Sequence, residues 1–106
     1  MSRETELEIE RQLQDAGLDA PRLTPADIDG KIKDVTYHQF PYTTVMVCAL
    51  TLENGFVVLG ESAAASSSNF NAAIGRKIAF EKAREKIWAL EGYLLRERLF
   101  RSSRGE

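Results

Sequence analysis

The stretch TTVMVCALTLENGFVVLGES, residues 43–62, decides the fold of this chain. Two runs of β-branched and other apolar residues flank Asn54-Gly55, the preferred dipeptide of a two-residue type I′ hairpin turn, because both residues tolerate a positive φ. A loop of two residues also sets the strand register and places Cys48 opposite Glu61. The stretch therefore predicts an antiparallel β-hairpin that reverses at residues 54 and 55.

This register gives the hairpin two faces, and both are largely apolar. One face carries Met46, Cys48, Leu50, Leu52, Val57 and Leu59, and the other carries Val45, Val47, Ala49, Thr51, Phe56 and Val58. A sheet that is apolar on both faces is normally covered on both sides, so we expect more than one helix to pack on it. The preceding VTYHQF, residues 35–40, is either a third strand or an irregular lead-in.

A long helix is predicted after the hairpin, over residues 71–99. Its main apolar face, expected to pack on the sheet, consists of Ala72, Ala79, Ala83, Ile87, Leu90 and Leu94. A second apolar stripe, formed by Ile74, Ile78, Trp88 and Leu95, lies on roughly the opposite side. A helix face turned to solvent does not normally carry such residues. We therefore expect either the N-terminal helices or a second copy of the chain to cover this stripe. We predict a homodimer or a higher oligomer that uses this stripe or an exposed edge of the hairpin.

The N-terminal part predicts two short helices. Residues 4–16 form an amphipathic pattern, and a second helix is expected from Pro25 to Asp34. Thr24 is a favourable N-cap for this second helix, and Asp27 completes a capping-box arrangement. We predict an α+β fold with an N-terminal amphipathic helix (1–18), a single α+β domain (19–100) and a disordered tail (101–106).

Composition excludes several classes of function. The chain has 106 residues, a formal charge of −2, one cysteine and one histidine. A lone Cys48 cannot form an intramolecular disulfide or a cysteine-based zinc site, and a lone His38 makes histidine-dependent catalysis improbable. The start MSRETELEIE is no signal peptide, and VMVCAL is too short to span a membrane. We expect a soluble protein of a reducing compartment, without enzymatic activity, cofactor or metal.

The stretch GESAAASSSNF, residues 60–70, contains four serines and has three readings. A nucleophile elbow around Ser62 would need a second glycine, but Ala64 stands at that position. The sequence also shows no second signature of a general base for this serine. As a phosphate cradle at a helix N-terminus, the stretch lacks a glycine fingerprint. Helix capping by Ser68, Asn69 or Asn71 explains the same residues without a ligand. We favour the passage from strand to helix.

Glu61 and Arg76 are expected to meet. The predicted register and the helical wheel turn both charges toward the core, where an unpaired charge is costly. They form either a structural latch or the wall of a polar pocket. In the second reading the candidate ligand-binding residues are Glu61, Ser62, Ser68, Asn69 and Arg76.

Two further features leave nucleotide or nucleic-acid binding open. The aromatic cluster YHQFPY, residues 37–42, either stacks on a base or covers the rim of the sheet. Basic residues outnumber acids between 75 and 86, although interspersed charges are typical of a solvated helix face.

A resemblance emerges from the residues already described. The string TLENGFVVLGESAAAS, followed by NFN, IGRKIA and KIWALEGYLL, resembles a family of small tailed-bacteriophage proteins. This family is named after the gene 49 product of a coliphage and the gene 66 product of a Shigella phage. The similarity covers about residues 19–97. Members commonly have aspartate where this chain has Asn71, and often cysteine where it has Ala64.

The resemblance implies a phage or prophage origin and action in the cytoplasm of an infected bacterium. It transfers no catalytic residue. Proteins of this kind commonly bind host factors or counter host defence, which is an analogy and not a property of the residues. Our leading hypothesis is a non-enzymatic accessory protein that binds a host or phage protein. The alternatives are a protein that sequesters a small ligand or nucleotide and a weak nucleic-acid-binding module.

Overall fold

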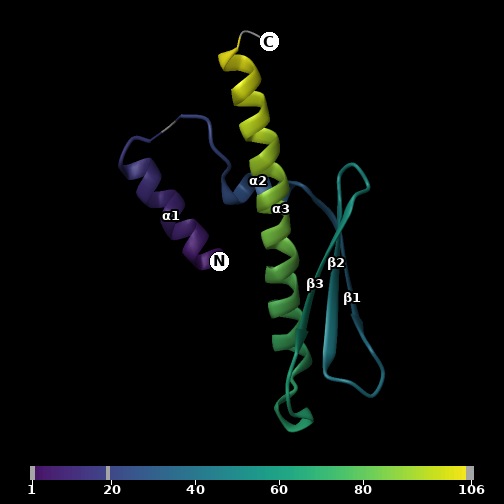
Figure 1. Ribbon diagram of the computed structural model, residues 1–106. Helices are drawn as coiled ribbons and strands as arrows, with labels where there is room; N and C mark the ends of the chain where they lie inside the picture. Colours follow the sequence, from purple (N-terminus) through teal and green to yellow (C-terminus); the bar gives the residue numbers. More distant parts are fainter. Residues whose placement is uncertain (1, 19, 105–106) are drawn as a thin grey trace.

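The computed structural model describes residues 2–18 and 20–104 and has an α+β fold (Figure 1). Its elements are α1 (Arg3–Asp15), α2 (Pro25–Gly30), β1 (Ile32–Gln39), β2 (Val45–Leu52), β3 (Val57–Ala63), a 3-10 turn η1 (Ser67–Asn69) and α3 (Ala72–Ser103). The strands form an antiparallel sheet in the order β1-β2-β3. Residues 35–39 thus belong to a third strand, which begins earlier than expected, at Ile32, while Phe40 lies outside it. Helix α3 packs on one face of this sheet and runs along its strands, and α1 lies on the side of α3 away from the strands (Figure 1).

The hairpin forms where the sequence predicts it, but the predicted turn type was wrong. Of the two turn residues Asn54 and Gly55, only Gly55 adopts a positive φ, of 89°. Its amide donates to the carbonyl of Leu52 at 2.9 Å, and the amide of Leu52 donates to the carbonyl of Phe56 at 2.8 Å. The loop therefore has three residues, 53–55, with the glycine in the left-handed conformation that such loops require. Cys48 pairs with Gly60 in place of Glu61.

This shift of one position exchanges the faces of β3, because successive strand residues point to opposite sides. Val58 is buried against α3 and Ser62 lies on the same face, whereas Val57 and Leu59 are 46% and 50% exposed on the outer face. No helix of the described residues covers that outer face, so the expectation of two covered faces was wrong. The inner face of β2 is as predicted, with Met46, Cys48, Leu50 and Leu52 all buried.

Small residues bring α3 close to the sheet. Ala79 and Ala83 are fully buried, and a Cβ at Gly60 would lie 2.2 Å from the carbonyl oxygen of Ala79. Ile87 completes the buried stripe. The stripe ends there because α3, at about 48 Å, is longer than strands of about 26 Å. Leu90 and Leu94, predicted to belong to the buried face, are 39% and 48% exposed.

Both N-terminal helices form, with altered details. The capping box of α2 is present: the Thr24 amide donates to the Asp27 carboxylate at 2.9 Å, and the Asp27 amide donates to the Thr24 hydroxyl at 3.2 Å. This helix ends at Gly30, four residues before the predicted end, because the chain enters β1 at Ile32. In α1 the buried side chain is Glu6, while Leu7 is 52% exposed.

Helix α3 continues to Ser103, beyond the predicted end at Leu99, and runs without interruption through Gly92. Residues 101–103, predicted to begin a disordered tail, are therefore helical. The last two residues of that predicted tail, 105–106, lie outside the described residues.

Candidate functional site: the polar end and the apolar groove of the β3 edge

The five predicted ligand-binding residues do not form one pocket. Glu61 pairs with Val47 and lies on the outer face of the sheet, whereas α3, which carries Arg76, packs on the inner face. Both side chains are exposed. The predicted convergence of Glu61 and Arg76 was wrong, because it rested on a hairpin register that is off by one residue.

Local structure accounts for three of these residues: Ser62 and Ser68 form hydrogen bonds within the chain, and Asn69 lies at a small hollow. Ser62 is 8% exposed, and its hydroxyl donates to the carbonyl of Gly75 at 2.8 Å, which ties β3 to the first turn of α3. The Ser68 amide donates to the hydroxyl of Ser66 at 3.3 Å. Ser62 and Asn69 both line a hollow of about 160 Å³. This volume is well below the roughly 300–1,000 Å³ of typical small-molecule sites.

Capping accounts for the polar residues before α3. The Asn71 carboxamide oxygen accepts from the amide of Ile74 at 3.0 Å, so Asn71 is the N-cap of α3. Ser66 plays the same part for η1. An aspartate at position 71 would carry an equivalent acceptor oxygen. The interpretation of residues 60–70 as a passage from strand to helix is confirmed.

The aromatic cluster lies at the end of β1 and in the loop to β2. The rings of His38 and Phe40 meet edge to face, with centroids 4.8 Å apart. Tyr42 is fully exposed and has a φ of 64°, a conformation that bulky side chains rarely adopt. Tyr37, on the inner face opposite Cys48, is 38% exposed, and partial burial raises the pKa of its hydroxyl. These rings form the rim of the sheet.

The four residues predicted to form an interface are divided between two sides of α3. Ile74 and Ile78 are exposed, at 58% and 40%. Trp88 is half-buried beside α1 and donates its indole N–H to the Glu6 carboxylate at 3.0 Å. Leu95 is half-buried as well. The N-terminal helix thus covers Trp88 but leaves both isoleucines open.

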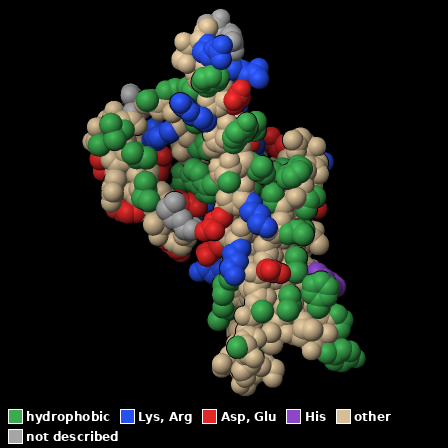
Figure 2. Space-filling model, in the orientation of Figure 1, with side chains coloured by type: hydrophobic (Ala, Val, Ile, Leu, Met, Phe, Trp, Pro, Cys, Tyr) green, Lys and Arg blue, Asp and Glu red, His purple; other side chains and the backbone are tan. Residues whose placement is uncertain are grey.

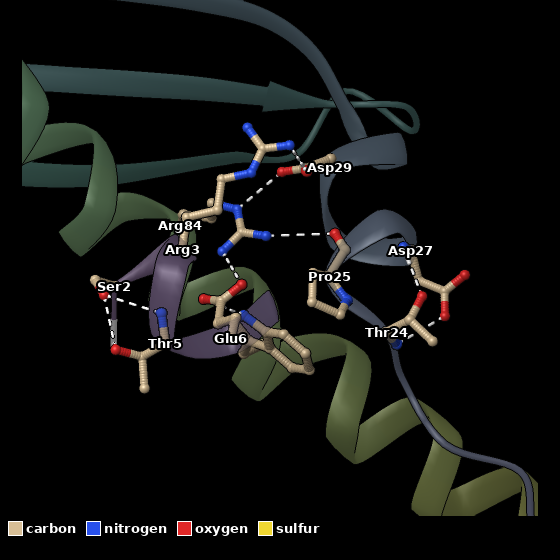
Figure 3. A network of polar contacts seen from close by, with 10 residues as sticks. Ser2, Arg3, Thr5, Glu6, Thr24, Pro25, Asp27, Asp29 and Arg84 are labelled. Carbon is tan, nitrogen blue, oxygen red and sulfur yellow. Dashed lines mark hydrogen bonds and ion pairs between the residues drawn. The ribbon is translucent and has the colours of Figure 1, made fainter. Parts of the chain in front are cut away.

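A buried ionic network joins α1 and α2 to α3 (Figure 3). Arg84 is 3% exposed and lies between two carboxylates: it forms an ion pair with Glu6 and donates to Asp29 at 2.9 Å. It also donates to the carbonyl of Pro25 at 3.3 Å. From the sequence, Arg84 was expected on a solvated face. Its position one residue after Ala83, at the border of the apolar stripe, was the available signal.

A large apolar groove was not revealed by the sequence patterns. It measures about 810 Å³ and lies between the hairpin end of the sheet and the second half of α3. Its walls include Phe56, Val57, Leu90, Tyr93 and Leu94, which are between 39% and 71% exposed. Hydrophobic side chains gather where the hairpin adjoins α3, with basic side chains nearby (Figure 2). Leu90 and Leu94 were expected in the core, which concealed the groove.

The structure places the single cysteine of the chain in the core. Cys48 is fully buried, and burial raises the pKa of its thiol, which keeps the sulfur in its less nucleophilic protonated form. Across residues 2–18 and 20–104, no three His, Cys, Asp or Glu side chains gather in a way that could hold a metal ion. No helix in the described part of the chain is long and apolar enough to cross a membrane.

These features define a small α+β protein whose three-stranded antiparallel sheet packs against one long helix and leaves an apolar groove at one edge. Residues 23–99, most of the chain, match the model of the "Phage protein (N4 Gp49/phage Sf6 gene 66) family", and the protein belongs to that phage protein family. No curated protein and no solved structure matches the chain.

Proposed function

We propose that this phage protein is a non-enzymatic accessory protein that binds a host or phage protein in the cytoplasm of the infected bacterium. The observation that carries the proposal is the groove of about 810 Å³ between the hairpin and α3. Its walls hold large apolar side chains that a protein without a partner would normally bury. Membership of the phage family supports an accessory role, and redirection of a host factor or counter-defence is the biological purpose we infer.

The composition of the groove favours a protein over a small polar ligand. Most of the lining side chains are apolar, and two of them, Phe56 and Tyr93, are aromatic. Aromatic side chains are enriched at the energetic centres of protein interfaces. Tyr93 is 71% exposed and Phe56 is 55% exposed, so both project far enough to enter a complementary surface. The groove is therefore suited to an apolar segment of another chain.

A matched pair of variants tests this proposal. The groove variant is Leu90→Glu with Leu94→Glu, and the control is Leu7→Glu with Ile9→Glu, which changes two comparably exposed apolar residues of α1. Circular dichroism first establishes that both variants are folded. Each protein is then used to capture partners from lysate of a bacterial host, and every captured protein is purified and titrated separately.

We expect the wild type and the α1 control to bind the same purified partner, and we expect the groove variant to lose at least tenfold in affinity, because two charges in an apolar interface are costly. Binding that is equally strong in the groove variant would overturn the proposal. The predicted homodimer is examined on the same samples by light scattering at high micromolar concentration.

The alternative function, sequestration of a small ligand or nucleotide, rests on Ser62, Asn69 and the aromatic rim. Thermal-shift screening against nucleotides tests it, because a ligand at 100 times its dissociation constant adds about 2.7 kcal/mol of stability. The second alternative, a weak nucleic-acid-binding module, predicts affinity that falls steeply with salt. The formal net charge of −2 does not favour it.

A further inference from the structure

The edge of the sheet beside the groove has no strand partner within the described chain. Strand β3 pairs with β2 on one side, and the order β1-β2-β3 leaves its other side at the border of the sheet. An edge strand presents backbone N–H and C=O groups that can pair with a further strand. β3 is seven residues long and contains no proline or lysine, so it lacks two of the devices by which proteins block such pairing.

One side of α3 runs beside this edge of the sheet, and we call it the flank. Its side chains follow a regular order. Every fourth residue points to the flank, in the order Ile74, Ile78, Lys82, Lys86, Leu90 and Leu94. The first two line the small hollow with Ser62 and Ala63, and the last three line the large groove with β3. All six side chains are exposed. Two lysines thus stand between two apolar pairs along the open edge.

The spacing of this flank matches that of a strand. Four helical residues advance by about 6 Å. Two strand residues advance by about 6.6 Å, and alternate strand residues point to the same face. A segment that extends β3 would therefore place every second side chain opposite one member of the series Ile78, Lys82, Lys86 and Leu90. The two central positions of that segment would face ammonium groups, and the outer two would face apolar side chains.

Charge decides which kind of strand fits. Gly60, at the middle of β3, lies against Ala79 and Ala83. A second copy related by a two-fold axis at this point would bring the two α3 flanks together in opposite directions, so that Lys82 of one copy would approach Lys82 of the other. Like charges so placed repel each other. The acid of β3 itself, Glu61, points to the opposite face of the sheet. A strand with two acidic residues between apolar ones complements the flank, whereas a copy of this chain does not.

We propose that the β3 edge accepts an extended segment of the partner protein with the pattern apolar-x-acidic-x-acidic-x-apolar, which adds a fourth strand to the sheet. This inference rests on the proposed function and specifies the partner at the same groove. Backbone hydrogen bonds to β3 supply sequence-independent affinity, and contacts with Lys82 and Lys86 supply selectivity. The pattern reads the same in both directions, so it fits parallel and antiparallel addition alike.

The probes are three synthetic peptides and three forms of the full chain. Acetyl-TVTETETVT-amide carries the pattern, TVTKTKTVT reverses its charges, and TVTEPETVT removes a central backbone donor. The protein forms are the wild type, Lys82→Glu with Lys86→Glu, and a control with the same change of net charge at two other exposed lysines, Lys33→Glu with Lys77→Glu. Binding is titrated to millimolar peptide by NMR, with the amides of residues 57–63 as reporters.

We expect the wild type and the control to bind the glutamate peptide about tenfold more tightly than the lysine peptide, as two exposed ion pairs replace two repulsions. The Lys82→Glu, Lys86→Glu form should reverse this preference, and the proline peptide should bind at least tenfold more weakly to every form. The largest shifts should fall on β3.

Equal binding of both charged peptides, or no binding at millimolar concentration, would overturn strand addition. So would sedimentation that shows a wild-type dimer dissociated by Leu90→Glu, because a second copy would then occupy the edge. If these results occur while the groove variant still loses its purified partner, the proposed function stands and only strand addition is wrong.

Discussion

The two sides of α3 are held by different interactions, close packing on one side and buried ion pairs on the other. Toward the sheet, small residues allow the backbones to approach closely, with Gly60 against Ala79 and Ala83. Toward α1, the buried Arg84 holds Glu6 and Asp29. The close packing at Gly60 acts only at short range, so neither β3 nor α3 can shift there without moving the other. The ion pairs of Arg84 are directional, and α1 can undock from them, which returns the Glu6 carboxylate to water. The sheet side therefore determines whether the domain folds, and the ionic side determines where α1 docks.

The largest effect is expected from Gly60→Ala. The added methyl group would lie 2.2 Å from the Ala79 carbonyl oxygen and 2.3 Å from the Ala83 amide nitrogen, and both atoms belong to the helix backbone. Helix α3 must move away from the sheet, so we expect a loss of at least about 3 kcal/mol in the free energy of unfolding, the upper end of typical overpacking. Urea denaturation measures it.

The control for this substitution is Gly92→Ala, because a Cβ at Gly92 meets nothing within 4 Å. This change should stabilise the protein by about 1 kcal/mol through helix propensity. A Gly60→Ala protein as stable as the wild type would contradict the close approach of α3 to the sheet.

The second effect is that of Arg84→Ala. It leaves the Glu6 carboxylate buried without its cationic partner, which commonly costs about 3–5 kcal/mol. Because α1 can undock, we expect a smaller loss of about 2–3 kcal/mol. Hydrogen exchange should accelerate in α1 far more than in the part of α3 that packs on the sheet.

An exposed ion pair provides the comparison for the buried one. Arg101 pairs with Glu97 at 2.9 Å, and both side chains are largely solvent-accessible. Arg101→Ala should cost less than about 0.5 kcal/mol. If the Arg84→Ala protein exchanged its α1 amides at the wild-type rate, the network would not be what holds this helix.

The smallest effect concerns pH and the capping box of α2. The amide of Thr24 donates to Asp27 and lowers the pKa of this carboxyl group. A pKa lowered by folding gives stability that is present above the unfolded pKa, near 4, and lost as the pH falls through the folded value. Because Asp27 is exposed, we expect Asp27→Asn to cost a few tenths of a kcal/mol at pH 7, and less at pH 3.

Thr24→Ala distinguishes the two halves of the box. It removes the hydroxyl that accepts from the Asp27 amide, and it should cost about 1 kcal/mol at both pH values. Denaturant titrations of both variants at pH 7 and pH 3 measure the differences. A cost of Asp27→Asn that grew toward acid would contradict the stabilising role of the ionised carboxylate.

Sequence-based prediction succeeded or failed according to the range of each interaction. The Thr24 capping box, the position of the hairpin and the packing of Ala79 and Ala83 were all predictable, because they follow from local patterns. The Glu61–Arg76 contact was wrong since the chosen turn had two residues in its loop and the actual turn has three. Asn-Gly is compatible with both turns, and the choice between them decides which face of the sheet each side chain of β3 occupies.

The candidate site was harder to predict than the fold. Four-residue spacing in α3 identified apolar stripes, but it could not say where the sheet ends beneath the helix. Leu90 and Leu94 continue the buried pattern of Ala83 and Ile87, and only the shorter length of the strands leaves them exposed. In the sequence Arg84 resembles a surface residue. The structure buries it because Glu6 of α1 and Asp29 of α2 supply carboxylate partners.

The sequence by itself determined the helices, the hairpin and their order along the chain, because capping, turn formation and apolar periodicity act between residues close together in the sequence. The tertiary structure decided which face of β3 is buried, where α1 docks and which part of α3 remains open. These outcomes depend on register, relative length and contacts between distant segments, and no local pattern encodes such quantities uniquely.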